Sequence, residues 1–148
     1  MTLEQKIIQL LEAQAISYEI AEHDPVYTNP AMAGALGVTE GETVKSLVLE
    51  TKEGEMIVMV LPGDRKVDWK AAASAAGTKK VSFARPEAVS RTVGCEVGCV
   101  PPFGHGLPVY MDKTLLEKDR MYFNPGVHHK SFSITGSSLK SLCRPSLL

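Results

Sequence analysis

The sequence has few of the features that mark membrane, disulfide-rich or disordered proteins. It has no run of eighteen apolar residues, so no segment is expected to span a membrane. Only three of its 148 residues are cysteines. Charged residues interrupt the apolar ones in residues 1–14, which is unlike a secretion signal. No long stretch is both polar and charge-rich, which argues against disorder. These absences predict a cytoplasmic protein with free thiols.

An excess of charge of one sign is also lacking. Sixteen basic residues nearly balance seventeen acidic ones, for a net charge of −1. This argues against a protein that coats nucleic acid by bulk electrostatics, and we expect neither a DNA nor a membrane partner. It still permits recognition of one end of an RNA. Basic residues gather in GTKKVSFAR (77–85) and near His128 and His129, although such groups are usually solvated surface.

What the sequence does contain is typical of one folded unit. Hydrophobic residues make up 44% of the chain and charged residues 22%, which are ordinary values for a globular protein. A chain of this length buries a substantial core without disulfides or metal. We found no internal repeat, linker or low-complexity tract, so the prediction is a single domain over residues 1–148.

The clearest local signal is a β-hairpin in the middle of the chain. Residues 43–51 (TVKSLVLET) and 55–62 (EMIVMVLP) are apolar, β-rich runs joined by the turn KEG. Helices and further strands are interleaved on both sides of it. Because a purely parallel, doubly wound sheet contains no such hairpin, we predict an α/β domain with one mixed sheet and helices packed around it.

Capping signals and periodicity place the other elements. Thr2 and Gln5 have capping-box spacing at the start of a helix over residues 2–14. Asn29 is expected to cap a short helix with Pro30 in its first turn and Gly37 at its end. The other predicted helical segments are 66–77, 85–93, 113–119 and 137–143, and the other strands are 17–23, 80–84, 107–112, 121–125 and 130–135.

Two parts of the chain could carry chemistry. Lys45 opens the first hairpin strand, on the same face as Leu47 and Leu49, so its ammonium group either extends to water or meets an oxygen of a ligand. The loop Gly98–Gly104 is stiff at its prolines and permissive at its glycines. It is either a rigid structural turn or a backbone wall beside a small ligand. Its intervening residues are Cys99, Val100, Pro101, Pro102 and Phe103.

Two other chemistries fit the residues less well. Cys95, Cys99, His105 and the pair His128–His129 could supply zinc ligands, but they do not form the two compact pairs of a zinc knuckle. Cys99 could act as a nucleophile with His105 as its base, although nothing around it matches a nucleophile signature. We therefore expect no metal ion and no cofactor.

Taken in order, several segments resemble the YbaK/ProX family, the free-standing relatives of the editing domain of bacterial prolyl-tRNA synthetase. The resemblance extends over about residues 16–142, and its most specific parts are the lysine of VKSLV and a Gly-x-x-x-Pro loop, here Gly98 to Pro102. The segments are EHDPVYTNPAMAGALGV, GETVKSLVL, VGCEVGCVPPFG, PVYMD and MYFNPG.

The resemblance implies a function and a site. It implies a curved, barrel-like sheet flanked by helices, and hydrolysis of the ester that joins a wrong amino acid to a tRNA, typically alanine or cysteine on the tRNA for proline. Lys45 corresponds to the essential lysine of the family, and Gly98 and Pro102 to the ends of the loop that lines the amino-acid pocket. The implied partners are the acceptor end of an aminoacyl-tRNA and a synthetase such as prolyl-tRNA synthetase. The alternative is a binding module of the same fold without hydrolytic activity.

Three departures from the family pattern concern the choice of substrate. Cys99 stands where relatives commonly have glycine or another very small residue, and Cys95 where a larger apolar residue is common. His128 and His129 lie in a segment that varies among relatives, and the resemblance implies that they border the pocket.

Overall fold

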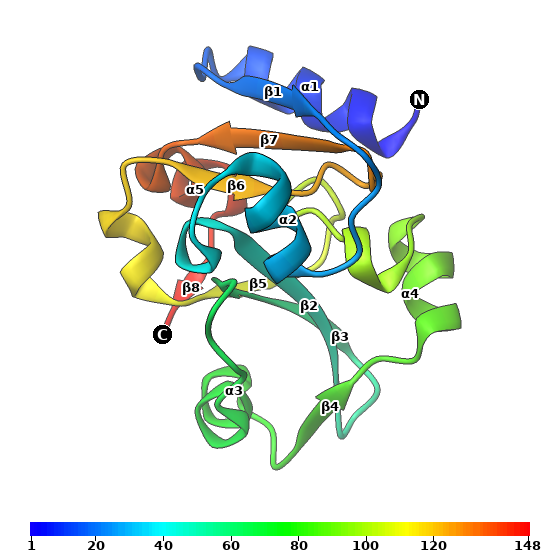
Figure 1. Ribbon diagram of the computed structural model, residues 1–148. Coiled ribbons are helices and arrows are strands. Elements are labelled where there is room, and N and C mark those ends of the chain that lie inside the picture. Colours follow the sequence, from blue (N-terminus) through cyan, green and yellow to red (C-terminus); the bar gives the residue numbers. More distant parts are fainter.

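The predicted hairpin forms the centre of the fold in the computed structural model, which describes all residues 1–148 (Figure 1). Strand β2 (Val44–Thr51) pairs antiparallel with β3 (Met56–Pro62), in a register that runs from Val44 opposite Pro62 to Glu50 opposite Met56. This confirms the hairpin, which arises from two β-rich runs joined by a short turn.

Three further strands extend the hairpin into a five-stranded mixed sheet, in the order β4-β2-β3-β5-β8. Strand β4 (Val81–Phe83) pairs antiparallel with the end of β2, and β5 (Val109–Met111) pairs parallel with β3. The short strand β8 (Ser146–Leu147), which the sequence did not predict, pairs parallel with β5.

The remaining strands form a separate antiparallel sheet, in the order β1-β7-β6. They are β1 (Glu19–Glu22), β7 (Lys130–Ile134) and β6 (Met121–Phe123). A single parallel bridge between Thr43 and Tyr122 joins the two sheets. The mixed α/β class is therefore confirmed, with the strands divided between two sheets and no closed barrel.

Helices begin at capped positions. The capping box of Thr2 and Gln5 is present as predicted, and Gly37 ends α2 in the left-handed conformation. The N-cap of α2 is Thr28 and not Asn29, because the Thr28 side chain accepts from Ala31 N while the Asn29 side chain turns to Thr43 and Val44. The α-helices are α1 (Leu3–Ala13), α2 (Asn29–Leu36), α3 (Trp69–Ala76), α4 (Pro86–Val93) and α5 (Gly136–Cys143), and the 3₁₀ turns are η1 (Glu40–Glu42), η2 (Val97–Cys99) and η3 (Lys113–Glu117). None of these helices could cross a membrane.

The two faces of the five-stranded sheet bury two apolar clusters. Val44 and Val48 of β2 belong to the larger cluster, which also contains residues of the second sheet and of α1, α4 and α5. Leu49 belongs to the smaller cluster against α3, and Leu47 packs on it. The period of two along β2 therefore places Lys45 on the face of Leu47 and Leu49, as predicted, and the structure shows that this face is turned toward α3.

Candidate functional site

A cavity of about 250 Å³ lies beside the first half of β2, between α2 and η2. It forms there because β4 pairs only with residues Leu49–Thr51 of β2 and leaves the preceding edge of the strand uncovered. Its apolar lining consists of Val26, Met32, Val44, Leu47, Val97 and Val100, and its polar lining of Thr28, Asn29, Lys45, Ser46, Gly98 and Asn124.

Lys45 reaches the rim of this cavity from the start of β2. Its Nζ donates a hydrogen bond of 2.7 Å to the carbonyl oxygen of Arg65, in the turn that follows β3. The turn begins at Gly63, whose N–H donates to the Thr43 carbonyl. One of the three ammonium hydrogens is thus engaged by the turn, which leaves two for a ligand.

The turn η2 supplies the opposite wall. An added Cβ at Gly98 would lie 3.3 Å from the Tyr27 carbonyl oxygen, so a side chain at this position would crowd the backbone before α2. The N–H group of Gly98 donates to no carbonyl or side-chain oxygen of the chain. The 3₁₀ turn Val97–Cys99 directs the N–H of the buried Val100 toward the Val97 carbonyl oxygen.

The uncovered edge of β2 supplies further unpaired groups. The carbonyls of Val44 and Val48 both turn away from β3, to Asn29 Nδ2 and to Ala84 N. Alternation along an antiparallel strand therefore turns the Ser46 peptide groups to the same edge. The Ser46 hydroxyl is also buried without a hydrogen-bond partner. Across the cavity, the Asn124 side-chain oxygen accepts from Gly126 N, which leaves its amide hydrogens as donors.

The cavity contains donors and a cation but no obvious base. No carboxylate, imidazole or thiol lines it. A reaction in this space therefore depends on positioning, on the charge of Lys45 and on backbone donors, with the nucleophile coming from water or from the substrate.

The structure places three other predicted site residues in a neighbouring hollow. Cys99, His128 and His129 line it together with Cys95. The His128 ring packs against Tyr27 at a centroid distance of 4.4 Å with the planes tilted by 42°, and its Nε2 lies 3.3 Å from Glu96 Oε2. None of them lines the Lys45 cavity, although His128 Cε1 lies 3.7 Å from the Cβ position of Gly98, which does. Their contact with a substrate stays a prediction.

The two thiols in this hollow differ in acidity. The hydrogen bond from Cys95, and then the charge of His128, hold the pKa of Cys99 below its ordinary value. The same hydrogen bond, together with burial, raises the pKa of Cys95. Cys99 is nevertheless only 3% exposed, and its Sγ contacts the Glu96 carbonyl oxygen at 3.5 Å. No group of three His, Cys, Asp or Glu side chains is placed to hold a metal ion.

The second half of the predicted loop is buried behind the cavity. Pro101, Pro102 and Phe103 have little exposed surface, and the Phe103 ring packs on Phe123 at 5.4 Å. The thiol of Cys143 in α5 donates to the Pro102 carbonyl oxygen at 3.3 Å, and burial raises the pKa of that thiol. An added Cβ at Gly104 would lie 2.8 Å from Ile7 Cδ1 of α1.

The structure thus brings Lys45, Gly98 and Val100 of the predicted set to one cavity, while Pro101, Pro102, Phe103 and Gly104 fix the position of η2 from behind. Sequence reasoning missed Thr28, Asn29, Ser46 and Asn124 as lining residues. The only signal for them was that each lies within a segment of the family resemblance.

Comparisons with known proteins agree on one family. Residues 23–142 match the model of the aminoacyl-tRNA editing domain. The chain is 26% identical to the prolyl-tRNA editing protein ProX of Acetoanaerobium sticklandii, over 97% of this chain and 92% of that protein. It is 31% identical to the proline–tRNA ligase of Chromobacterium violaceum, over 70% of this chain and 19% of the ligase. A solved structure titled "Crystal structure of a putative trans-editing enzyme for prolyl tRNA synthetase" superposes with a TM-score of 0.87 at 26% identity, over 100% of this chain and 96% of that one.

Proposed function

Because the chain belongs to the aminoacyl-tRNA editing domain family, we propose that it hydrolyses the ester of a misacylated tRNA in the cavity between Lys45 and Gly98. The observation that carries this proposal is the shared cavity itself. Lys45 is the lysine of the VKSLV motif that carries the family resemblance. It borders the same cavity as the first residues of the Gly-x-x-x-Pro loop, although the two lie more than fifty positions apart in the chain.

The size of the cavity favours a small amino acid. Its 250 Å³ corresponds to about eight water molecules at about 30 Å³ each, which is below the usual range of pockets for drug-sized ligands. An aminoacyl group and its ester fit such a space, whereas the adenosine that bears them must lie at the rim. Alanine or cysteine on the tRNA for proline is the substrate that we propose. Discrimination by fit is needed because a single methylene gives only about 1–3 kcal/mol.

The proposed mechanism uses the unpaired groups of the site. The N–H group of Gly98 stabilises the oxyanion that develops on the ester carbonyl oxygen. Lys45 holds the terminal ribose, and the Ser46 carbonyl accepts from the α-ammonium group of the amino acid. The ribose 2′-hydroxyl orients the attacking water, whose oxygen bonds to the carbonyl carbon. The bond to the ribose 3′-oxygen then breaks, and that oxygen takes up the proton that the water releases.

The proposed partner is the acceptor end of an aminoacyl-tRNA, delivered in the cytoplasm by a synthetase such as prolyl-tRNA synthetase. The alternative is a tRNA-binding or synthetase-binding module without hydrolytic activity. A binding module does not need unpaired hydrogen-bond donors opposite a lysine in the same cavity, and this favours the enzyme.

A deacylation panel tests the proposal. Alanyl-, cysteinyl-, seryl- and threonyl-tRNA are offered to the unaltered protein and to Lys45→Ala, Cys99→Ala and Lys140→Ala. We expect cleavage of alanyl- or cysteinyl-tRNA, and a fall of about 100-fold or more for Lys45→Ala, because a ribose that is no longer held misplaces the reacting ester. Lys140→Ala, an exposed lysine on α5, is the matched control and keeps full activity.

The other outcomes separate the alternatives. Cleavage of none of the four esters by the unaltered protein supports the binding module. Loss of activity only in Cys99→Ala supports a cysteine nucleophile. We expect Cys99→Ala to remain active with an altered preference among the four esters.

A further inference from the structure

An exposed aromatic pair with lysines around it lies at the end of the molecule formed by α3 and β4 (Figure 1). Trp69 is 40% and Phe83 59% exposed, and their rings meet edge to face at a centroid distance of 5.0 Å. They form part of a pocket of about 420 Å³. The full lining is Trp69, Lys70, Ala73, Lys79, Lys80, Val81, Ser82 and Phe83.

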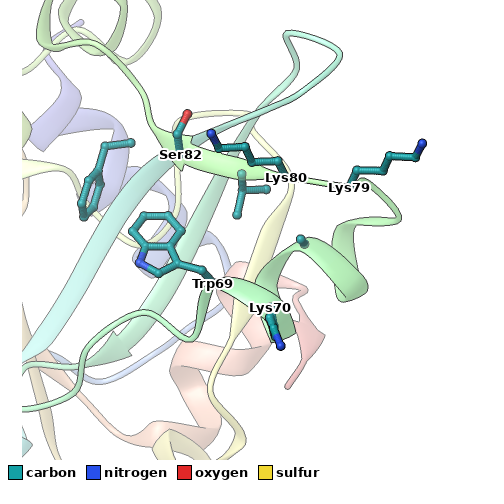
Figure 2. A pocket seen from close by; sticks show the side chains of 8 residues that line it. Trp69, Lys70, Lys79, Lys80 and Ser82 are labelled. Carbon is teal, nitrogen blue, oxygen red and sulfur yellow. The ribbon is translucent and has the colours of Figure 1, made fainter.

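The charge around this pocket has one sign. Its three lysines are exposed, and no carboxylate lines it. Figure 2 shows the Trp69 ring lying beneath β4, with Lys79 and Lys80 extending from the chain that leads into the strand and Lys70 projecting from α3. The acidic residues beside it are held outside the lining, since Asp68 caps α3 through Ala71 N, Glu53 accepts from Thr78 Oγ1, and Glu50 lies opposite Ser82 on β2. In a chain with a net charge of −1, this is a local cationic surface.

Aromatic faces bordered by ammonium groups match the chemistry of single-stranded nucleic acid. Bases stack on exposed rings whatever their sequence, and lysines contact the phosphates between them. A protein partner with apolar side chains would use the rings but not three lysines, and a duplex would use the lysines but not the rings. The charge and the rings together therefore favour an unpaired RNA strand.

The position of the pocket relative to the proposed site supports the same partner. Phe83 pairs with Leu49 of β2, and Lys45 lies four residues earlier on the same face of that strand. At about 3.3 Å per residue the two sites are about 13 Å apart along β2. A strand whose last nucleotide lies at Lys45 spans this distance with a few nucleotides.

We propose that Trp69, Phe83 and the lysines around them form a second RNA-binding site, which holds the unpaired nucleotides upstream of the terminal adenosine of the tRNA. This inference rests on the proposed function, because it takes the substrate to be a tRNA with its 3′ end in the Lys45 cavity. The site adds affinity for the polynucleotide and takes no part in ester cleavage.

Trp69 is the only tryptophan of the chain, so its fluorescence reports on this site without any need for hydrolysis. The probe is an RNA hairpin with an unpaired 3′ CCA end, and the same hairpin without the overhang is its control. We expect the overhang to quench the Trp69 emission. Phe83→Ala keeps the reporter and weakens binding by about five-fold or more. With three lysine–phosphate contacts the slope of log affinity against log salt is about −2, and the double variant Lys79→Ala, Lys80→Ala lowers its magnitude by about 1.4.

Measurements of deacylation activity test the second RNA-binding site independently. Trp69→Ala raises KM for misacylated tRNA but leaves cleavage of an aminoacyl ester of adenosine unchanged, because that ester is too short to reach the second site. Trp69→Phe, which keeps a ring, restores KM. The double variant Lys118→Ala, Lys140→Ala is the matched loss of charge on other elements, and it changes neither the salt slope nor KM.

The outcomes separate the two proposals. If neither ester is cleaved but the overhang still quenches Trp69, the function is wrong and the RNA site remains. If misacylated tRNA is cleaved while the overhang gives no quenching and Trp69→Ala has an unchanged KM, the second site is refuted. Equal quenching by a polyglutamate peptide would assign the surface to acidic protein partners instead.

Discussion

Among single residues, Ser46 carries an unusual combination of features. Its hydroxyl is buried without a partner, although nearly all buried polar groups in proteins are hydrogen-bonded. The residue also lines the proposed site, and its peptide groups face the uncovered edge of β2. An unsatisfied group at such a place costs stability in the free protein, and we expect the hydroxyl, in addition to the Ser46 carbonyl, to gain a hydrogen-bond partner when substrate binds.

Replacing Ser46 therefore separates stability from function. We expect Ser46→Ala to leave the free energy of unfolding unchanged or to raise it by up to about 1 kcal/mol, while kcat/KM for deacylation falls. Urea denaturation and single-turnover deacylation measure the two effects. Ser133→Ala is the matched control, because the buried Ser133 hydroxyl accepts from Arg120. Its loss lowers stability by about 1 kcal/mol. A stability loss at Ser46 as large as that at Ser133 contradicts the account.

The site residues that the sequence identified stand out in their local segments, whereas those it missed become site residues only through the tertiary structure. Lys45 and Gly98 belong to family motifs, and a lysine is an unusual residue type in an apolar strand. Ser46 and Asn124 are ordinary residues until tertiary structure brings β2 and the end of β6 to the same cavity. No local pattern encodes that convergence.

At the scale of elements, local sequence was sufficient wherever the decisive interaction is local. The β2–β3 hairpin follows from two β-rich runs and a short turn, and the start of α1 from a capping box. Strand β8 was missed because two exposed residues become a strand only by pairing with β5. The division into two sheets was missed because it depends on β6 meeting β2 only at the bridge between Thr43 and Tyr122. Pairing between strands so far apart in the chain is not encoded in any one segment.

The turn after β3 is the element that holds Lys45 in place, and Gly63 allows it to approach η1. An added Cβ at Gly63 would lie 2.6 Å from the Glu40 carbonyl oxygen, which no real side chain tolerates without movement of the backbone. We expect Gly63→Ala to lower stability by about 3 kcal/mol, at the upper end of overpacking effects, and to lower the rate of deacylation by moving the Arg65 carbonyl.

A second glycine provides the control for this substitution. Gly34 lies inside α2 with open space around its Cβ position, so Gly34→Ala is expected to raise stability by about 0.5–1 kcal/mol through helix propensity. Thermal denaturation of both variants checks the prediction. Equal stability of the two would show that the turn can move away from η1 at no cost.

At the scale of the whole molecule, one strand connects the two proposed sites. The start of β2 borders the cavity for the aminoacyl ester, and its end supports the aromatic surface beside α3. A chain with little net charge can then hold a large polyanion by its 3′ end alone. Val44 and Val100 of the larger core cluster line the cavity, whereas the aromatic surface lies on the face toward α3, so the two sites meet along the exposed edge of the strand.

The most direct test of the central claim locates the substrate in the cavity. Methyl groups of Val, Leu, Ile and Met are observed by NMR while the protein is titrated with an amide analogue of alanyl-adenosine that cannot be hydrolysed. The account predicts chemical-shift changes at Met32, Val44, Val97 and Val100, which line the cavity, and none at the distant core methyl of Ile134. Changes confined to Val127, beside Cys95 and Cys99, would contradict it.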